Sequence, residues 1–269
     1  MKVGVLTSVE VRHRYFVSAL YERVDVVAVG YERTGYSPAE VASSDLTADE
    51  VRVVAEHFEE RARQEHLFFG AGSDLVVDGP PCAVEHLPPG TLNSAATIRF
   101  LEQAGVDTVV VYGTNLIKPP LLGGWPDRMI NMHLGLSPYY RGTATNFYPL
   151  LNEEPQYVGA TIHLLDAGID SGAILRHARP EIVSDDGPHT IGCKAILAGI
   201  GAMLTVLEEL NRGHLVPVPQ WDVPVARLYL RKDYHPRQVV ELHRKLESGL
   251  IADYVRRAAE VAPRVRLVE

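Results

Sequence analysis

The feature that most constrains the fold is an alternation of short apolar runs with segments of helical length. Residues 2–7 and 25–30 form apolar runs of strand length on either side of a helix-length segment near residues 14–23. A strand that is apolar at almost every position is buried on both faces, and a helical connection between two such strands makes them parallel. The alternation therefore predicts an α/β protein with a mostly parallel sheet flanked by helices.

The alternation continues along the chain and sets its expected organisation. Further strands are expected over 74–78, 107–112 and 174–183, and further helices over 49–69, 93–104 and 191–210, with a loop over 79–90. After Gly213, prolines at positions 217, 219 and 224 interrupt the pattern before a helix-like stretch over 236–261. We therefore expect a main domain at 1–213 and a short C-terminal appendage at 214–269.

Charge and composition narrow the classes of function. The chain has 26 Lys and Arg against 34 Asp and Glu, a net charge of −8, which disfavours nucleic-acid binding because phosphate contacts need clustered positive charge. No apolar run approaches the ~18 residues that cross a bilayer, and the first strand begins at residue 2 without a secretion signal. We expect a cytoplasmic protein that binds no membrane.

The two cysteines and eleven histidines form no Cys-x-x-Cys, His-x-x-x-His or His-Glu-x-x-His pattern, so neither a disulfide framework nor a metal site is expected.

Two polar segments in the main domain carry the residues best suited to catalysis. The first contains Asn131 and His133, and the second contains Asp170. Asn131 and His133 are two positions apart, so on a strand both side chains point to the same face. The glycines and proline that follow end such a strand, which places both residues at its carboxyl end, where open α/β sheets hold their ligands.

An amide, an imidazole and a carboxylate match what the transfer of an acyl group to an amine requires. Asn131 can donate a hydrogen bond from its side-chain amide to the negative charge that develops on the carbonyl oxygen. His133 can serve as general base or proton shuttle, because imidazole titrates near neutral pH. Asp170 can orient His133, stabilise its charged form or position a relay water. These three residues are the predicted catalytic trio.

The two segments together resemble the folate-dependent formyltransferases. That family has Asn-x-His, a proline five residues after the histidine and a glycine four residues later, and Pro138 and Gly142 fill those places here. His163 and Asp170, seven residues apart, match the family's second segment. The family often has Pro-Ser-Leu-Leu after the histidine, whereas this chain has Leu-Gly-Leu-Ser at 134–137. The resemblance implies a Rossmann-like sheet and the catalytic roles given above.

The resemblance also implies roles for residues outside the trio. Its cosubstrate would be 10-formyltetrahydrofolate, which two loops would contact. The first loop is Gly113, Thr114, Asn115, Leu116 and Ile117, and the second is Asp166, Ala167 and Gly168. The alternative interpretation of each loop is a structural turn that does not contact folate. His163 is expected to support the trio by hydrogen bonding rather than to relay a proton. The candidates for contact with the acceptor, with surface or packing roles as the alternative, are Arg12, His13, Tyr140 and Arg141.

The short tail makes the organisation most similar to that of the sugar N-formyltransferases. We therefore expect formyl transfer to the primary amine of a small molecule, a nucleotide-linked amino sugar. The alternatives are another metabolite or methionyl-tRNA as acceptor, hydrolysis of 10-formyltetrahydrofolate, and folate binding without catalysis. The tail shows no set of five strands like the additional domain of longer methionyl-tRNA enzymes, and the segment 7–14 lacks the phosphate-binding turn of enzymes that act on glycinamide ribonucleotide. Dimerisation through the tail is an expectation from the family.

Overall fold

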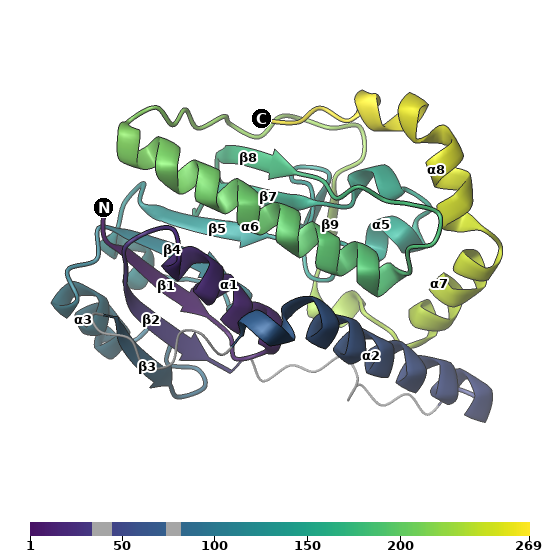
Figure 1. The fold of residues 1–269 in the computed structure, drawn as a ribbon, viewed down its shortest axis with the longest axis horizontal. Helices are drawn as coiled ribbons and strands as arrows, with labels where there is room; N and C mark the ends of the chain where they lie inside the picture. The colour runs from purple at the N-terminus through teal and green to yellow at the C-terminus, as the bar shows by residue number, and fades with distance from the viewer. Residues whose placement is uncertain (34–44, 74–81) are drawn as a thin grey trace.

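A seven-stranded sheet forms the centre of the part of the chain that our computed structural model describes, residues 1–33, 45–73 and 82–269 (Figure 1). Its strand order is β3-β2-β1-β4-β5-β7-β8, in which β1 to β5 are parallel and β7 and β8 are antiparallel to their neighbours. The strands are β1 (Val3–Thr7), β2 (Val26–Glu32), β3 (Ala83–Leu87), β4 (Thr108–Tyr112), β5 (Met129–His133), β7 (Ala160–Leu164) and β8 (Ile174–Ala178). The predicted α/β architecture is confirmed.

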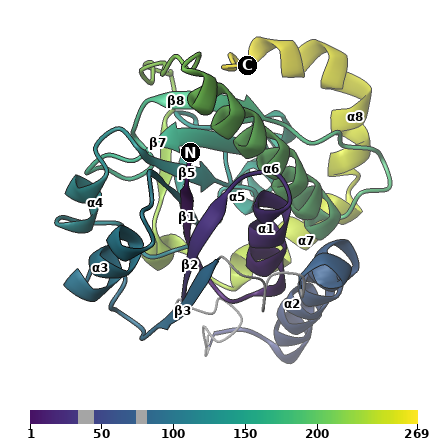
Figure 2. The same ribbon diagram turned by 60° about the vertical axis from the view of Figure 1, so that its left-hand side comes forward.

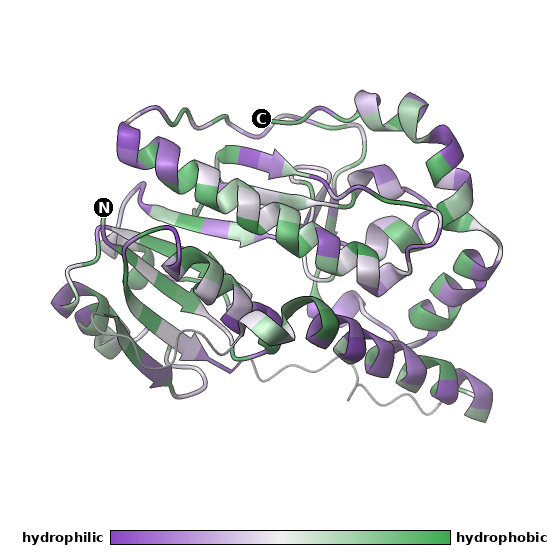
Figure 3. Cartoon of the chain, viewed as in Figure 1, coloured by the Kyte–Doolittle hydropathy of each residue, from purple (hydrophilic) through white to green (hydrophobic). Residues whose placement is uncertain are grey.

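Helices cover both faces of the sheet, which explains the continuous apolar strands (Figure 2). Every residue of β1 and β4 is buried. One face packs against α1 (Val11–Tyr21), α6 (Pro188–Arg212) and the end of α2 (Ala48–Phe69). The other face packs against α3 (Ala95–Gln103) and α4 (Leu121–Gly124). The inner strands are accordingly hydrophobic, whereas α2 is largely hydrophilic (Figure 3).

The ends of the two long helices follow local sequence signals. At the start of α2, the Thr47 hydroxyl accepts a hydrogen bond from the Glu50 N–H, and the Glu50 carboxylate accepts one from the Thr47 N–H, which is the reciprocal arrangement of a capping box. Helix α6 begins at Pro188 and ends before Gly213, whose φ of 72° is left-handed. By length and hydropathy α6 resembles a membrane-spanning helix. Its buried face packs on the sheet, however, and a helix in the core of a protein often has the same length and hydropathy.

Three predicted elements differ from the structure. The loop expected over 79–90 contains β3, whose first four residues are exposed, so this edge strand has no apolar run to reveal it. The extended segment expected over 174–183 ends at Ala178 as β8. The helix expected over 236–261 is two helices, α7 (Arg237–Glu247) and α8 (Leu250–Val261), because Gly249 has a φ of 92° and breaks it. The strand expected over 74–78 lies outside the described residues.

The C-terminal residues pack back against the middle of the chain. Strand β9 (Arg227–Tyr229) pairs in parallel with β6 (Tyr140–Gly142). Side chains of α7 and α8 share a hydrophobic core with α5 (Phe147–Leu151). The predicted appendage therefore shares structure with the main domain, and the boundary at 213 stays a prediction. The remaining short elements are the 3₁₀ helices η2 (Gly70–Gly72), η3 (Pro155–Tyr157), η4 (Arg231–Asp233) and η5 (Ala262–Arg264).

Candidate active site

The pairing of β5 with β7 brings the two polar segments together. In this antiparallel register Asn131 lies opposite His163, and His133 lies opposite Thr161. Because directly opposed residues share a face of the sheet, the Asn131 side chain reaches His163, and its Nδ2 lies 3.1 Å from His163 Nε2. His163 Nδ1 lies 2.8 Å from the Leu164 carbonyl oxygen. A carbonyl only accepts, so Nδ1 carries the proton and Nε2 accepts from Asn131.

The Asp170 carboxylate enters from the loop after β7 and joins all of these groups. Oδ1 lies 3.3 Å from Asn131 Nδ2 and 3.5 Å from His163 Nε2. Oδ2 lies 3.3 Å from His133 Nδ1 and accepts a hydrogen bond from the Gly142 N–H at 2.9 Å. The structure therefore brings the predicted trio together with His163, and it adds a backbone donor that the sequence analysis did not identify.

Burial sets the electrostatics of the pair formed by His133 and Asp170. His133 is 6% exposed, and burial lowers its pKa below the ordinary value, although the Asp170 charge opposes that shift and His163 reinforces it. Burial alone would raise the pKa of Asp170. The positive charge of His133, the nearby His163 ring and the hydrogen bond from the Gly142 N–H outweigh burial and hold that pKa below its usual range. Asp170 is therefore a carboxylate at neutral pH.

Both ring nitrogens of His133 are engaged in this structure. Nε2 lies 3.0 Å from the Tyr140 carbonyl oxygen, so Nε2 carries a proton, while Nδ1 faces Asp170. The two amide protons of Asn131 point to His163 and Asp170. The groups thus form one connected network at the carboxyl end of β5.

The loop between β5 and β6 is held by hydrogen bonds to Thr161 of β7, and Gly142 after it is held by β9. The Thr161 hydroxyl donates to the Gly135 carbonyl at 2.6 Å and accepts from the Ser137 N–H at 2.9 Å. Gly142 has a φ of 92°, and a Cβ at that position would lie 1.9 Å from the Tyr229 carbonyl oxygen of β9. Only glycine fits there, and this close approach keeps the Gly142 N–H aimed at Asp170.

The acceptor-contact candidates fall into two groups. Tyr140 is fully buried, and its hydroxyl donates to the Glu154 carboxylate, so its backbone carbonyl is the part that meets His133. Arg141 is half-buried, and its Nε has no hydrogen-bond partner among the described residues. Tyr140 and Arg141 therefore adjoin the trio, and contact with an acceptor stays a prediction for both.

Arg12 and His13 belong to a separate buried cluster. Arg12 pairs with Glu65 of α2 at 2.7 Å, and His13 Nδ1 lies 2.6 Å from the Glu10 carboxylate. Burial, reinforced by Arg12, lowers the pKa of His13 to about 4. The His13 ring packs so closely on Gly113 that a Cβ there would lie 2.2 Å from its Nε2. His13 therefore adjoins the first predicted folate loop, and an acceptor role for Arg12 and His13 stays a prediction.

The two predicted folate loops lie at strand ends near the trio. The first follows β4. There Asn115 donates to the buried Glu32 carboxylate at 3.0 Å and accepts from Arg231 at 3.0 Å, while Leu116 is 54% exposed. In the second loop, which follows β7, the Asp166 carboxylate accepts from the Gly168 N–H at 3.0 Å and from the Ser171 hydroxyl at 2.9 Å. The Asp166 side chain is therefore bonded within its own loop.

One residue at the site was not predicted from the sequence. Gln220 donates from Nε2 to the carbonyl oxygens of Asp170 at 2.7 Å and of Gly172 at 3.0 Å. It lies among the prolines at 217, 219 and 224 that mark the tail, and a single glutamine about fifty positions from its partner carries no pattern that could reveal the contact.

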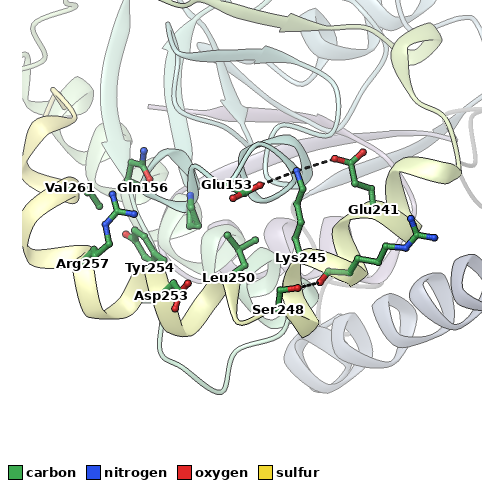
Figure 4. Close-up of a pocket in the computed structure, with 12 residues that line it drawn as sticks. Glu153, Gln156, Glu241, Lys245, Ser248, Leu250, Asp253, Tyr254, Arg257 and Val261 are labelled. Atoms are coloured by element: carbon green, nitrogen blue, oxygen red, sulfur yellow. Dashed lines mark hydrogen bonds and ion pairs between the residues drawn. The ribbon is translucent and has the colours of Figure 1, made fainter.

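A cleft of about 590 Å³ lies elsewhere, between α7, α8 and the segment around η3 (Figure 4). Its positive and negative side chains are mixed, and Lys245 bridges Glu153 and Glu241. The described residues that line it include none of the trio, so this cleft is separate from the candidate active site.

Comparison with known proteins decides the family. The family model described as formyl transferase matches residues 39–207, more than half of the chain. The chain belongs to the formyl transferase family. The motif segments 131–142 and 163–172 both lie within this match, and the family suggested by the sequence is confirmed.

Individual relatives differ in how much of their sequence and structure they share with this chain. The methionyl-tRNA formyltransferase of Microcystis aeruginosa (strain NIES-843 / IAM M-2473) is 32% identical over 151 residues, which are 55% of this chain and 46% of that protein. The chain thus matches about half the length of such curated relatives. A sugar N-formyltransferase structure from Shewanella sp FDAARGOS_354 has a TM-score of 0.58 at 16% identity, covering 91% of this chain and 88% of the other.

A further structural relative was solved as a complex with two ligands. The formyltransferase PseJ from Anoxybacillus kamchatkensis, in complex with UDP-4,6-dideoxy-4-formamido-L-AltNAc and tetrahydrofolate, has a TM-score of 0.50 at 15% identity and covers 89% of this chain and 97% of that one. Likeness at these identities shows the shared fold.

Proposed function

We propose that the protein is an N-formyltransferase that moves the formyl group of 10-formyltetrahydrofolate to the primary amine of a small molecule. The observation that carries the proposal is the network of Asn131, His133, His163 and Asp170 at the carboxyl end of β5, in a chain whose family is the formyl transferases.

Each member of the network has a part in the proposed reaction. Asn131 donates to the formyl oxygen as negative charge develops there. To do so its amide gives up the longer of its two present hydrogen bonds, the one of 3.3 Å to Asp170. The pair of His133 and Asp170 takes the proton that the attacking amine loses and passes it toward the leaving nitrogen. His163 accepts from Asn131 and so holds the amide in position.

The two loops beside the trio fit the proposed folate cosubstrate, which supplies the activated formyl group. Both loops lie at the ends of strands that adjoin the trio, and Leu116 offers exposed apolar surface for a flat ring. Residues 113–117 and 166–168 are the proposed contacts. Tetrahydrofolate is bound in the related PseJ structure, which supports this assignment.

A nucleotide-linked amino sugar is the proposed acceptor. Sugar N-formyltransferase and PseJ structures match over about nine tenths of this chain and of their own lengths. The net charge of −8 opposes a nucleic-acid acceptor. We further propose that the enzyme works in the cytoplasm, where a reduced folate and a nucleotide sugar are both available, and that any homodimer forms through the tail.

Methionyl-tRNA is the second candidate acceptor, because sequence identity favours it. The Microcystis methionyl-tRNA formyltransferase is 32% identical to this chain, although the match spans 46% of that protein. A tRNA acceptor needs a positively charged surface that this acidic chain has to supply locally.

The decisive experiment supplies purified protein with 10-formyltetrahydrofolate and, separately, a panel of nucleotide-linked amino sugars, simple amines and methionyl-tRNA. Tetrahydrofolate release and the mass of the acceptor are followed together. An acceptor heavier by one formyl group establishes transfer and names its class, with an amino sugar as the expected result. Folate release without an adduct supports hydrolysis instead, and the absence of both signals with every amine contradicts the proposed function.

A further inference from the structure

The candidate active site depends on a segment that lies far from it in sequence. Residues 216–221 run beside the start of β8, where Ile174 and Val218 exchange two backbone hydrogen bonds of 2.8 Å. This pairing is the anchor of the segment. Two residues further on, it places the Gln220 side chain against the loop that carries Asp170.

The loop that carries Asp170 needs such a support. Asp170 has a φ of 48°, a left-handed backbone conformation that is uncommon for residues with a Cβ, although aspartate adopts it more often than most. At Gly172 the chain runs so close to β7 that a Cβ would lie 1.8 Å from the Leu164 carbonyl oxygen. The backbone carbonyls of Asp170 and Gly172 both turn toward the segment 216–221, and each needs a donor.

Gln220 supplies both donors from one side-chain amide. Nε2 lies 2.7 Å from the Asp170 oxygen and 3.0 Å from the Gly172 oxygen. The orientation of the amide is unambiguous, because the opposite orientation would place Oε1 against two carbonyl oxygens. Oε1 itself is buried without a hydrogen-bond partner among the described residues.

We propose that Gln220 is a positioning residue, which keeps the Asp170 carboxylate in register with Asn131 and His133 by holding the left-handed turn at Asp170. The inference rests on the proposed function for its kinetic consequence. Its structural consequence concerns the contact between Asp170 and His133, which exists whatever the acceptor is.

Two variants remove the donors in different ways. Gln220→Met keeps the length and the apolar part of the side chain, and Gln220→Glu keeps the shape but directs oxygens at both carbonyls. Val216→Ala is the matched control, because Val216 lies in the same segment and is 74% exposed. We expect Gln220→Met to lower kcat by about 10- to 100-fold with KM changed less than threefold, since a displacement of about 1 Å costs a catalytic site roughly that much. Gln220→Glu is expected to lower kcat further.

A second readout separates positioning from general structural damage. The imidazole signals of His133 are followed by NMR against pH in the free protein, assigned with His133→Gln. Wild type and Val216→Ala are expected to titrate alike. Gln220→Met is expected to titrate at lower pH, because Asp170, which opposes the burial-induced lowering of the His133 pKa, has moved away. Circular dichroism confirms that each variant is folded, and the two Gln220 variants give independent chances of a folded protein.

The outcomes separate this inference from the proposed function. An unchanged His133 titration in folded Gln220→Met overturns the positioning role, whatever the kinetics. The expected His133 shift in a protein that transfers no formyl group upholds the positioning role and rejects the proposed reaction. Equal losses of activity in Gln220→Met and Val216→Ala also overturn the positioning role of Gln220, because they show that any change in the segment 216–221 has the same effect.

Discussion

Replacement of Asp170 by asparagine tests the centre of the proposed mechanism. The change keeps the size of the side chain but removes its charge, which lies 3.3 Å from His133 Nδ1. At an effective dielectric constant of about 20, two unit charges at that separation interact by about 5 kcal/mol. His133 becomes positively charged as it takes the proton from the amine, and Asp170 then stabilises that charge. In Asp170→Asn this stabilisation is absent from the rate-determining step. The expected fall in kcat is therefore about 10³- to 10⁴-fold.

The assay is steady-state formyl transfer by Asp170→Asn across the pH range. The KM for the folate is expected to change little, because the predicted folate loops are left intact. His133 as a base must be neutral, so activity falls as the pH drops through its pKa. Since Asp170 opposes the burial-induced lowering of that pKa, its removal should move this acid limb to lower pH. A loss of less than tenfold, or an acid limb that moves to higher pH, refutes the reasoning.

Three further predictions follow from the described contacts. Asn131→Ala should lower kcat by about 10²- to 10³-fold with little change in KM, because one donor to the developing charge is lost; steady-state kinetics checks this. Gly142→Ala should lower the free energy of unfolding by about 3 kcal/mol, measured by urea denaturation, because its Cβ would meet the Tyr229 carbonyl at a φ of 92°. His57 lies near His189 and His243, and burial, reinforced by both, lowers its pKa from 6.5 to about 2. The unfolded chain therefore binds a proton below pH 6.5 that the folded chain excludes, and between pH 7.5 and 5 wild type should lose about 2 kcal/mol more stability than His57→Phe in urea titrations.

The sequence could predict the strands and the trio because both rest on short-range patterns. Buried parallel strands read as apolar runs, and the spacing of Asn131 and His133 places both on one face of a strand. The meeting of Asn131 with His163 required the antiparallel pairing of β5 with β7. Nothing in a short apolar run fixes the direction of its neighbour, so that contact could be anticipated only through the family resemblance.

The parts that could not be predicted depend on long-range contacts or on exposure. Strand β3 is exposed at four of its five residues, and its pairing with β2 is what makes it a strand. The break between α7 and α8 occurs at Gly249, and a glycine within an amphipathic stretch is also tolerated inside a continuous helix. Gln220 is held against Asp170 by the pairing of Val218 with Ile174, which no local pattern records.

The pairing of β6 with β9 has a consequence for how the protein is made. Residues 131–172 supply the trio, but Gly142 is held by β9, and Asn115 is bonded to Arg231 across 116 positions. During synthesis the sheet can form while these later residues are still inside the ribosome. The contacts that hold Gly142 and Asn115 can form only after position 231 has emerged, so a nascent chain that already contains every member of the trio still lacks them.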